Sequence, residues 1–115
     1  MENNKINDLI EKLDSIQYAR IEFNEENVKS EIYQIANETV VVDDLLSLAC
    51  AVSMLPFSEE DEGLEIARNI ADLAIEIAVK DKNIANLEKI ADELENSLEI
   101  DDLAEEVREI ISSMS

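Results

Sequence analysis

The chain contains no histidine and no tryptophan, and it has only one glycine, one proline and one cysteine in 115 residues. The absence of histidine removes the commonest general base and the usual base beside a serine or cysteine nucleophile. One glycine cannot build a phosphate-binding loop, and one cysteine cannot form a disulfide within the chain. So few glycines and prolines also disfavour a fold with many tight hairpins. We therefore predict that the protein is not an enzyme and binds no cofactor.

Acidic side chains are plentiful, but they show no metal-binding pattern. The run Ser58 to Glu65 (SEEDEGLE) lacks the alternating ligands and the spaced glutamate of a calcium-binding loop. A di-iron site of the helical-bundle type needs Glu-x-x-His motifs, which a chain without histidine cannot supply. The sequence therefore predicts no metal site and no catalytic residues.

Basic residues are also scarce, because 9 lysines and arginines face 29 aspartates and glutamates, a net charge of −20. The imbalance is greater in residues 58–115, with 18 acids and 5 bases, than in residues 1–57, with 11 acids and 4 bases. Such a surface repels nucleic acid and anionic membranes and attracts basic proteins. We therefore expect a basic protein as partner, with no direct binding of nucleic acid or membrane. The N-terminal segment lacks the apolar core of a secretory signal, which favours a cytoplasmic location.

The most apolar stretch runs from Val40 to Phe57 (VVVDDLLSLACAVSMLPF). It predicts a central buried helix that begins near Asp43 and ends at Pro56, with Cys50 as a small core residue. Its uncharged part is too short to span a membrane. The β-branched run just before it predicts an extended link, or alternatively a short strand pairing with residues 21–23.

Apolar residues recur at helical spacing through most of the remaining chain. They predict helices from Lys5 to about Tyr18, after an Asn24 cap, after a Ser58 cap, from Ile84 to Leu98 and from Leu103 to Met114. The apolar phase slips by one residue between the last two segments, which places a break at residues 97–102, with a single bent helix over residues 82–113 as the alternative.

These patterns together predict a single all-α domain over residues 1–115. We expect a compact bundle of five or six helices, or a short stack of helical hairpins, that is monomeric or weakly dimeric. Alanines after Ser58 favour close packing of the two most apolar helices as a hairpin at the centre. The predicted core is Leu46, Ala49, Val52, Ile70, Leu73, Ala74 and Ile77.

One acidic pattern exceeds what composition explains. The acids follow steps of three and four residues along the last two predicted helices, at Glu88, Asp92, Glu95, Glu99, Asp102, Glu106 and Glu109. Such spacing aligns carboxylates about one helical turn apart, where like charges repel each other. A protein that accepts this repulsion has a use for it, so we predict these seven residues as the partner-binding face. We also expect the repulsion to raise carboxyl pKa values, so that mild acid stabilises the fold.

In size, charge and helical character the chain resembles the phage-encoded nucleic-acid mimics that block restriction or CRISPR nucleases. The resemblance covers bulk properties and transfers no site residues. It implies a small cytoplasmic inhibitor or adaptor whose carboxylates occupy a basic, nucleic-acid-binding surface, as in an anti-restriction or anti-CRISPR protein. The alternatives are an immunity protein or antitoxin against a basic toxin, and a structural helical module for self-association.

Overall fold

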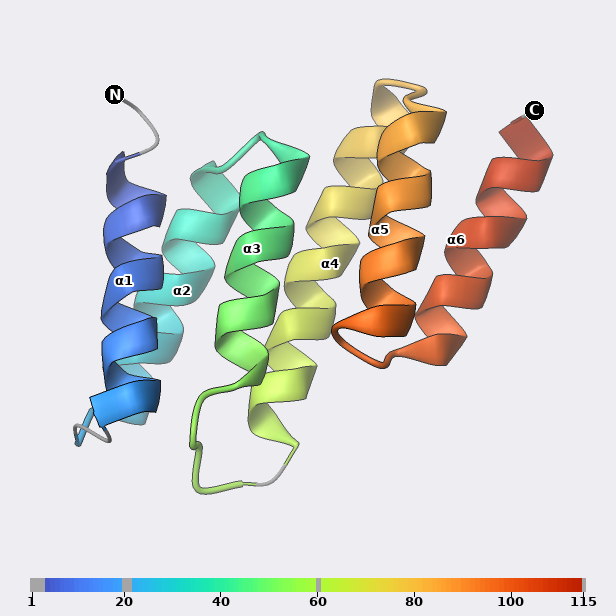
Figure 1. Cartoon of the computed structure of the whole chain (residues 1–115). Helices are drawn as coiled ribbons and strands as arrows, with labels where there is room; N and C mark the ends of the chain where they lie inside the picture. The colour runs from blue at the N-terminus through green and yellow to red at the C-terminus, as the bar shows by residue number, and fades with distance from the viewer. Residues whose placement is uncertain (1–3, 20–21, 60, 115) are drawn as a thin grey trace.

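The computed structural model describes residues 4–19, 22–59 and 61–114, and these residues form an all-α fold, as predicted. Six helices account for most of this part of the chain (Figure 1). Their bounds are α1 (Asn4–Ala19), α2 (Glu25–Glu38), α3 (Val42–Ser53), α4 (Glu62–Lys80), α5 (Ile84–Asn96) and α6 (Asp101–Met114). None of these helices is both long enough and apolar enough to cross a membrane.

The helices form three hairpins in a row, the stacked form of the predicted fold. Figure 1 shows α1–α2, α3–α4 and α5–α6 side by side, with α1, α3 and α5 nearer the viewer than α2 and α4. Contacts run within each hairpin and also between α4 and α5, α1 and α3, α2 and α4, and α3 and α5. The result is a flat molecule of 46 × 33 × 19 Å.

The core is apolar throughout and is densest between α3 and α4, which share the most extensive helix contact. Of the seven predicted core residues, five are buried: Leu46, Ala49, Val52, Ile70 and Ala74. The other two predictions were wrong, because Leu73 and Ile77 are only partly buried at the margin of the core. Alanines on α4 bring α3 close, and the larger side chains of α4 flank this contact.

Local capping explains several helix ends. The Asn24 side chain accepts a hydrogen bond from the Asn27 backbone N–H at 3.1 Å, which confirms the predicted cap of α2. The predicted Ser58 cap of the following helix is wrong, because α4 begins at Glu62. The Ser58 hydroxyl instead donates to Glu25 Oε2 at 2.6 Å and ties this loop to α2.

Among the described residues, two connections between helices contain a residue in the left-handed region. Lys82 (φ 54°) ends α4, with the Asn83 N–H donating to the Ala78 carbonyl at 2.9 Å. Glu99 (φ 56°) lies in the break between α5 and α6, at the position that the phase slip predicted. The link before α3 is extended at Thr39 and Val41. The alternative prediction was a short strand pairing with residues 21–23. Phe23 is in no strand, and residue 21 lies outside the described residues.

The single glycine lies where α4 starts against the end of α3. A Cβ atom at Gly63 would lie 2.9 Å from the Val52 carbonyl oxygen and 3.4 Å from Phe57 Cδ2. Gly63→Ala should therefore destabilise the fold by about 1–2 kcal/mol after helix propensity is counted. Chemical denaturation measures this, and the sign is decisive, because alanine stabilises an unhindered helical site. A stabilised variant would show that α3 and α4 can move apart freely.

Candidate partner-binding surface

Most of the scarce basic side chains lie between helices. In the described part of the chain, six of them form ion pairs, and every pair joins two different helices. The pairs are Lys5–Glu38 and Lys12–Glu31 between α1 and α2, Lys29–Glu62 between α2 and α4, Arg68–Asp102 between α4 and α6, Lys89–Asp43 between α5 and α3, and Arg108 with Asp92 and Glu95 between α6 and α5. These six basic side chains therefore link neighbouring helices of the stack.

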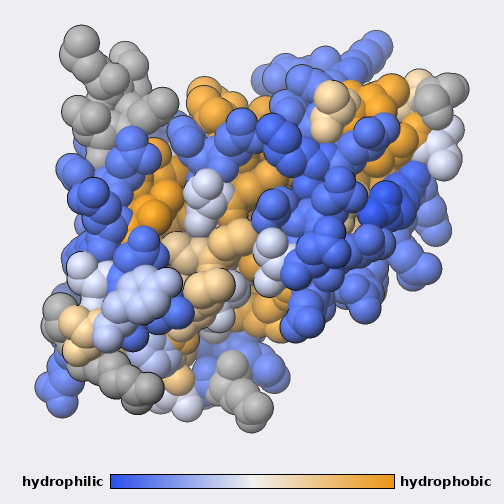
Figure 2. Space-filling model, viewed as in Figure 1, coloured by the Kyte–Doolittle hydropathy of each residue, from blue (hydrophilic) through white to orange (hydrophobic). Residues whose placement is uncertain are grey.

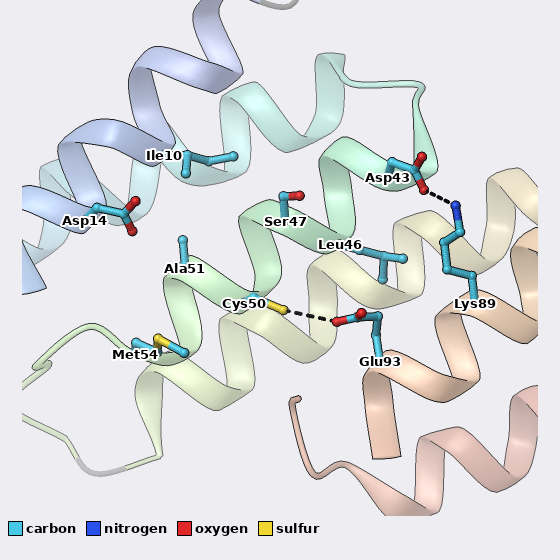
Figure 3. Close-up of a pocket in the computed structure, with 10 residues that line it drawn as sticks. All are labelled: Ile10, Asp14, Asp43, Leu46, Ser47, Cys50, Ala51, Met54, Lys89 and Glu93. Carbon is cyan, nitrogen blue, oxygen red and sulfur yellow. Dashed lines mark hydrogen bonds and ion pairs between the residues drawn. The ribbon is translucent and has the colours of Figure 1, made fainter. Parts of the chain in front are cut away.

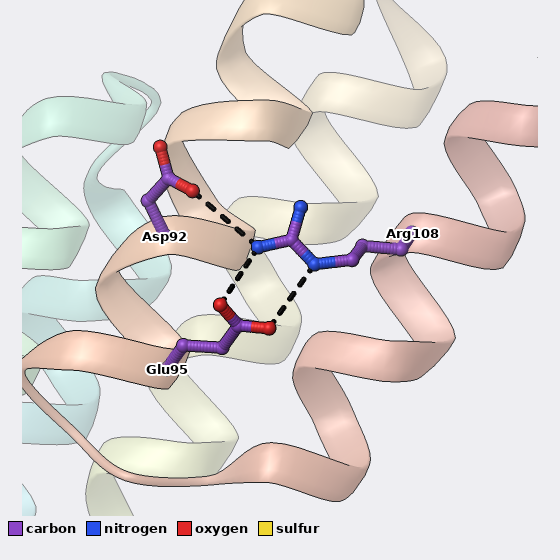
Figure 4. Close-up of polar contacts among 3 residues, drawn as sticks. All are labelled: Asp92, Glu95 and Arg108. Atoms are coloured by element: carbon purple, nitrogen blue, oxygen red, sulfur yellow. Dashed lines mark hydrogen bonds and ion pairs between the residues drawn. The ribbon is translucent and has the colours of Figure 1, made fainter.

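Two of the predicted binding residues meet at Arg108 (Figure 4). Arg108 Nε and Nη2 donate to the two oxygens of Glu95 at 3.2 and 2.9 Å, and Nη2 also donates to Asp92 Oδ1 at 3.4 Å. Asp92 and Glu95 share one face of α5 because they are three residues apart. The prediction that these two acids share a helix face is therefore correct, but Arg108 of the facing helix α6 neutralises part of their charge.

Asp102 is directed to a different neighbour. Its oxygens accept hydrogen bonds from Arg68 Nη1 at 3.3 Å and Nη2 at 2.8 Å, which link α6 to α4. The predicted row is therefore divided, because Asp92 and Glu95 of α5 pair with Arg108 of α6, whereas Asp102 of α6 pairs with Arg68 of α4.

The other four predicted acids are exposed and pair with no base in the described part of the chain: Glu88, Glu99, Glu106 and Glu109. Glu99 belongs to the α5–α6 connection rather than to a helix.

The structure adds a second set of acids that the prediction left out. Glu65, Asp72 and Glu76 are exposed on the outer side of α4, at a spacing that aligns them along one face. Asp72 of α4 and Glu106 of α6 both act electrostatically on Arg68, so these two acids lie near the same arginine. The α4 acids were present in the sequence as part of a narrow polar stripe, but the link from Arg68 to α6 was not. The exposed acids of α4, α5 and α6 are hereafter called the acidic surface.

The pKa values of three carboxyls follow from these contacts. Hydrogen bonds from Arg108 and Arg68 lower the pKa of Glu95 below its ordinary 4.5 and that of Asp102 below its ordinary 3.8. The pKa of Asp72 is raised above 3.8, chiefly by partial burial; attraction to Arg68 opposes this and repulsion from Glu76 adds to it. Only Asp72 follows the expected direction, and repulsion is its lesser cause.

Asp72→Asn and Asp102→Asn should have opposite effects on stability at pH 7. A carboxyl with a raised folded-state pKa disfavours the fold when ionised, so Asp72→Asn should stabilise, by no more than about 0.5 kcal/mol. A carboxyl with a lowered pKa supports the fold when ionised, so Asp102→Asn should destabilise. As the pH falls, the Asp72→Asn difference should disappear first, as Asp72 becomes protonated through its raised pKa, whereas the Asp102→Asn difference should persist below pH 3.8, because the pKa of Asp102 is lowered. Melting temperatures from pH 7 to pH 3 measure this, and equal signs at pH 7 would contradict it.

No group of three or more metal-ligating side chains in the described residues is placed to hold an ion. The chain matches no protein-family model, no curated protein and no solved structure significantly. The functional proposal therefore depends on the charge and shape of this molecule alone.

Proposed function

We propose that this protein is a small inhibitor or adaptor that binds the basic, nucleic-acid-binding surface of a partner protein. The acidic surface of α4, α5 and α6 would occupy the Lys/Arg channel that normally follows phosphates. A phage-type inhibitor of a restriction or CRISPR nuclease fits this proposal. The occupied channel would exclude DNA or RNA, and the partner would lose its substrate.

The observation that supports the proposal is the separation of charge within the fold. Six bases are held at helix seams, whereas acids of α4, α5 and α6 face solvent without a matching base. A protein that needed acid only for solubility would gain from mixed Glu–Lys pairs on the exposed helix faces, because these are mildly stabilising. Here the pairing instead ties helices to one another, both within and between hairpins, and the outward charge of α4, α5 and α6 is mostly negative, with Lys80 and Lys82 as exposed exceptions at the α4–α5 turn.

Charge density also favours two adjacent acidic rows over one. A row of acids one turn apart on a helix presents one negative charge per about 5.4 Å. Each strand of DNA presents one per about 3.4 Å. The α6 acids alone fall short of this density, and acids of α4 would add to it, as Asp72 does near Arg68, where Glu106 of α6 also acts. We therefore extend the proposed contact surface from the seven predicted acids to Glu65, Asp72 and Glu76.

Competition with nucleic acid tests the proposal. Immobilised protein should capture a partner from extracts of its native host at low salt, and duplex DNA or RNA should release that partner. The purified partner should then bind either nucleic acid or this protein, but not both together. A partner that binds nucleic acid while still in complex with the protein would overturn the proposal. A toxic nuclease as partner would identify an immunity protein or antitoxin that uses the same surface.

A further inference from the structure

A groove runs along the outer side of α3, between α1 and α5. It encloses about 470 Å³, and its floor includes Leu46, Ala51 and Met54. Figure 2 shows pale and orange surface in the middle of this face, with hydrophilic surface on either side. This groove corrects the prediction of a central helix inside the protein with Cys50 in the core, because Ser47 is exposed, Cys50 is half-buried, and Met54, just after α3, is 55% exposed.

Two carboxylates face this groove from opposite walls (Figure 3). Asp14 comes from α1 and Glu93 from α5, both are half-buried, and neither has a base within ion-pair distance in the described part of the chain. The one base in the lining, Lys89, is held at 2.8 Å by Asp43. Glu93 accepts only a weak hydrogen bond from the Cys50 thiol, at 3.5 Å. Partial burial and Glu93 raise the pKa of Cys50 to about 11, so the thiol keeps its proton at neutral pH and acts as a donor.

We propose that this groove binds an amphipathic helix of a partner protein that carries lysine or arginine beside its apolar face. The apolar side chains would pack on Leu46, Ala51 and Met54, and the basic ones would pair with Asp14 and Glu93. The floor extends about 12 Å along the helix direction from Leu46 to Met54. This length matches two turns of a docked helix, whose apolar anchor residues would stand at positions i, i+3 or i+4, and i+7.

Charge decides among the possible occupants. A second copy of this chain brings a net charge of −20, and an anionic membrane is also negative, so both are repelled from walls that carry unpaired carboxylates. The helices of the described chain already bury their own apolar faces in the core. A basic amphipathic helix is the occupant that satisfies both the floor and the walls. This inference goes beyond the proposed function, because it uses the side of α5 that faces α3.

Synthetic peptides test the groove without knowledge of the natural partner. The probe is an 18-residue leucine–lysine peptide patterned as an amphipathic helix, with a leucine–lysine peptide of scrambled order and a leucine–glutamate helix as comparisons. Fluorescence anisotropy should show that the first peptide binds at least about tenfold tighter than either of the others. Equal binding of the scrambled peptide would overturn the proposal, because bulk charge would then explain the attraction.

Two matched pairs of variants locate the binding. Asp14→Asn with Glu93→Gln should weaken binding about tenfold, whereas Asp8→Asn with Glu26→Gln removes the same charge elsewhere and should weaken it less than about twofold. Ser47→Trp should block the groove, whereas Ser30→Trp, at an exposed position of α2, should not. Circular dichroism verifies that each variant is folded. Equal effects of the two variants within either pair would overturn the proposal. It would also be overturned if the wild type formed a dimer that Ser47→Trp dissociates, because the groove would then bind a second copy of this chain.

The groove and the acidic surface can fail separately. Reversal of Glu88, Glu99, Glu106 and Glu109 to lysine should preserve the preference for the amphipathic peptide over the scrambled one. Loss of that preference would mean that the peptide reports the acidic surface, and the groove proposal would fall while the proposed function stood.

Discussion

Reversing Glu88, Glu99, Glu106 and Glu109 to lysine should weaken binding to a basic partner by roughly 100-fold or more, because each change replaces an attraction with a repulsion. These four are chosen because they are exposed and hold no base. Reversal of Glu95 or Asp102 would also break the pairs with Arg108 and Arg68 and would mix a structural effect with the binding effect. Titration of the captured partner measures the affinity, and wild-type affinity should fall steeply between low and physiological salt.

The matched control reverses Asp8, Glu11, Glu22 and Glu26, which are exposed on or beside α1 and α2 at the other end of the stack. Both quadruple variants change the net charge by the same amount, so a difference between them cannot come from bulk charge. We expect the control to lose less than about tenfold, through slower encounter alone. Equal losses would show that no localised acidic surface exists. Intact binding in both variants would direct attention to the apolar groove on α3.

The fold was predictable from the sequence wherever one apolar face was clearly periodic. The break between α5 and α6 followed from the slip in apolar phase, even though the turn uses Glu99 in place of a glycine. The start of α4 was not predictable in this way. Ser58 has the right chemistry for a cap, but its hydroxyl bonds to Glu25, 33 residues earlier in the chain. Local propensity cannot anticipate a competing partner that only the tertiary fold supplies.

The candidate surface was predictable in part, for a similar reason. Spacing along α5 and α6 identified acids that share a helix face, and Asp92 and Glu95 do lie together. Arg68 of α4 and Asp102 of α6 are 34 residues apart, and their pairing depends on how the last hairpin stacks on the one before it. No periodicity within one helix contains that information. The groove was missed because the apolar run around Cys50 predicted complete burial, whereas the middle helix of a layer keeps its outer side open.

The largest effect on stability should come from a charge in the centre of α4, and α4 contains its own control. Ile70 is fully buried, whereas Leu73, one turn later, is only partly buried. Ile70→Asp would bury an unpaired carboxylate against α3 and remove core volume, so we expect the domain to be unfolded at 25 °C, with the helical circular dichroism signal largely lost. Leu73→Asp can turn its carboxylate toward water and should leave the domain folded with a lower melting temperature.

The comparison is informative because the two variants carry the same new charge on the same helix. The added acid worsens the net negative charge equally, so any difference reports burial rather than general repulsion. If Leu73→Asp unfolded the protein and Ile70→Asp did not, the face of α4 that packs on α3 would be the one centred on Leu73. The alanines buried on α4 oppose that outcome, because Ala67, Ala71, Ala74 and Ala78 are all fully inaccessible on the same side as Ile70.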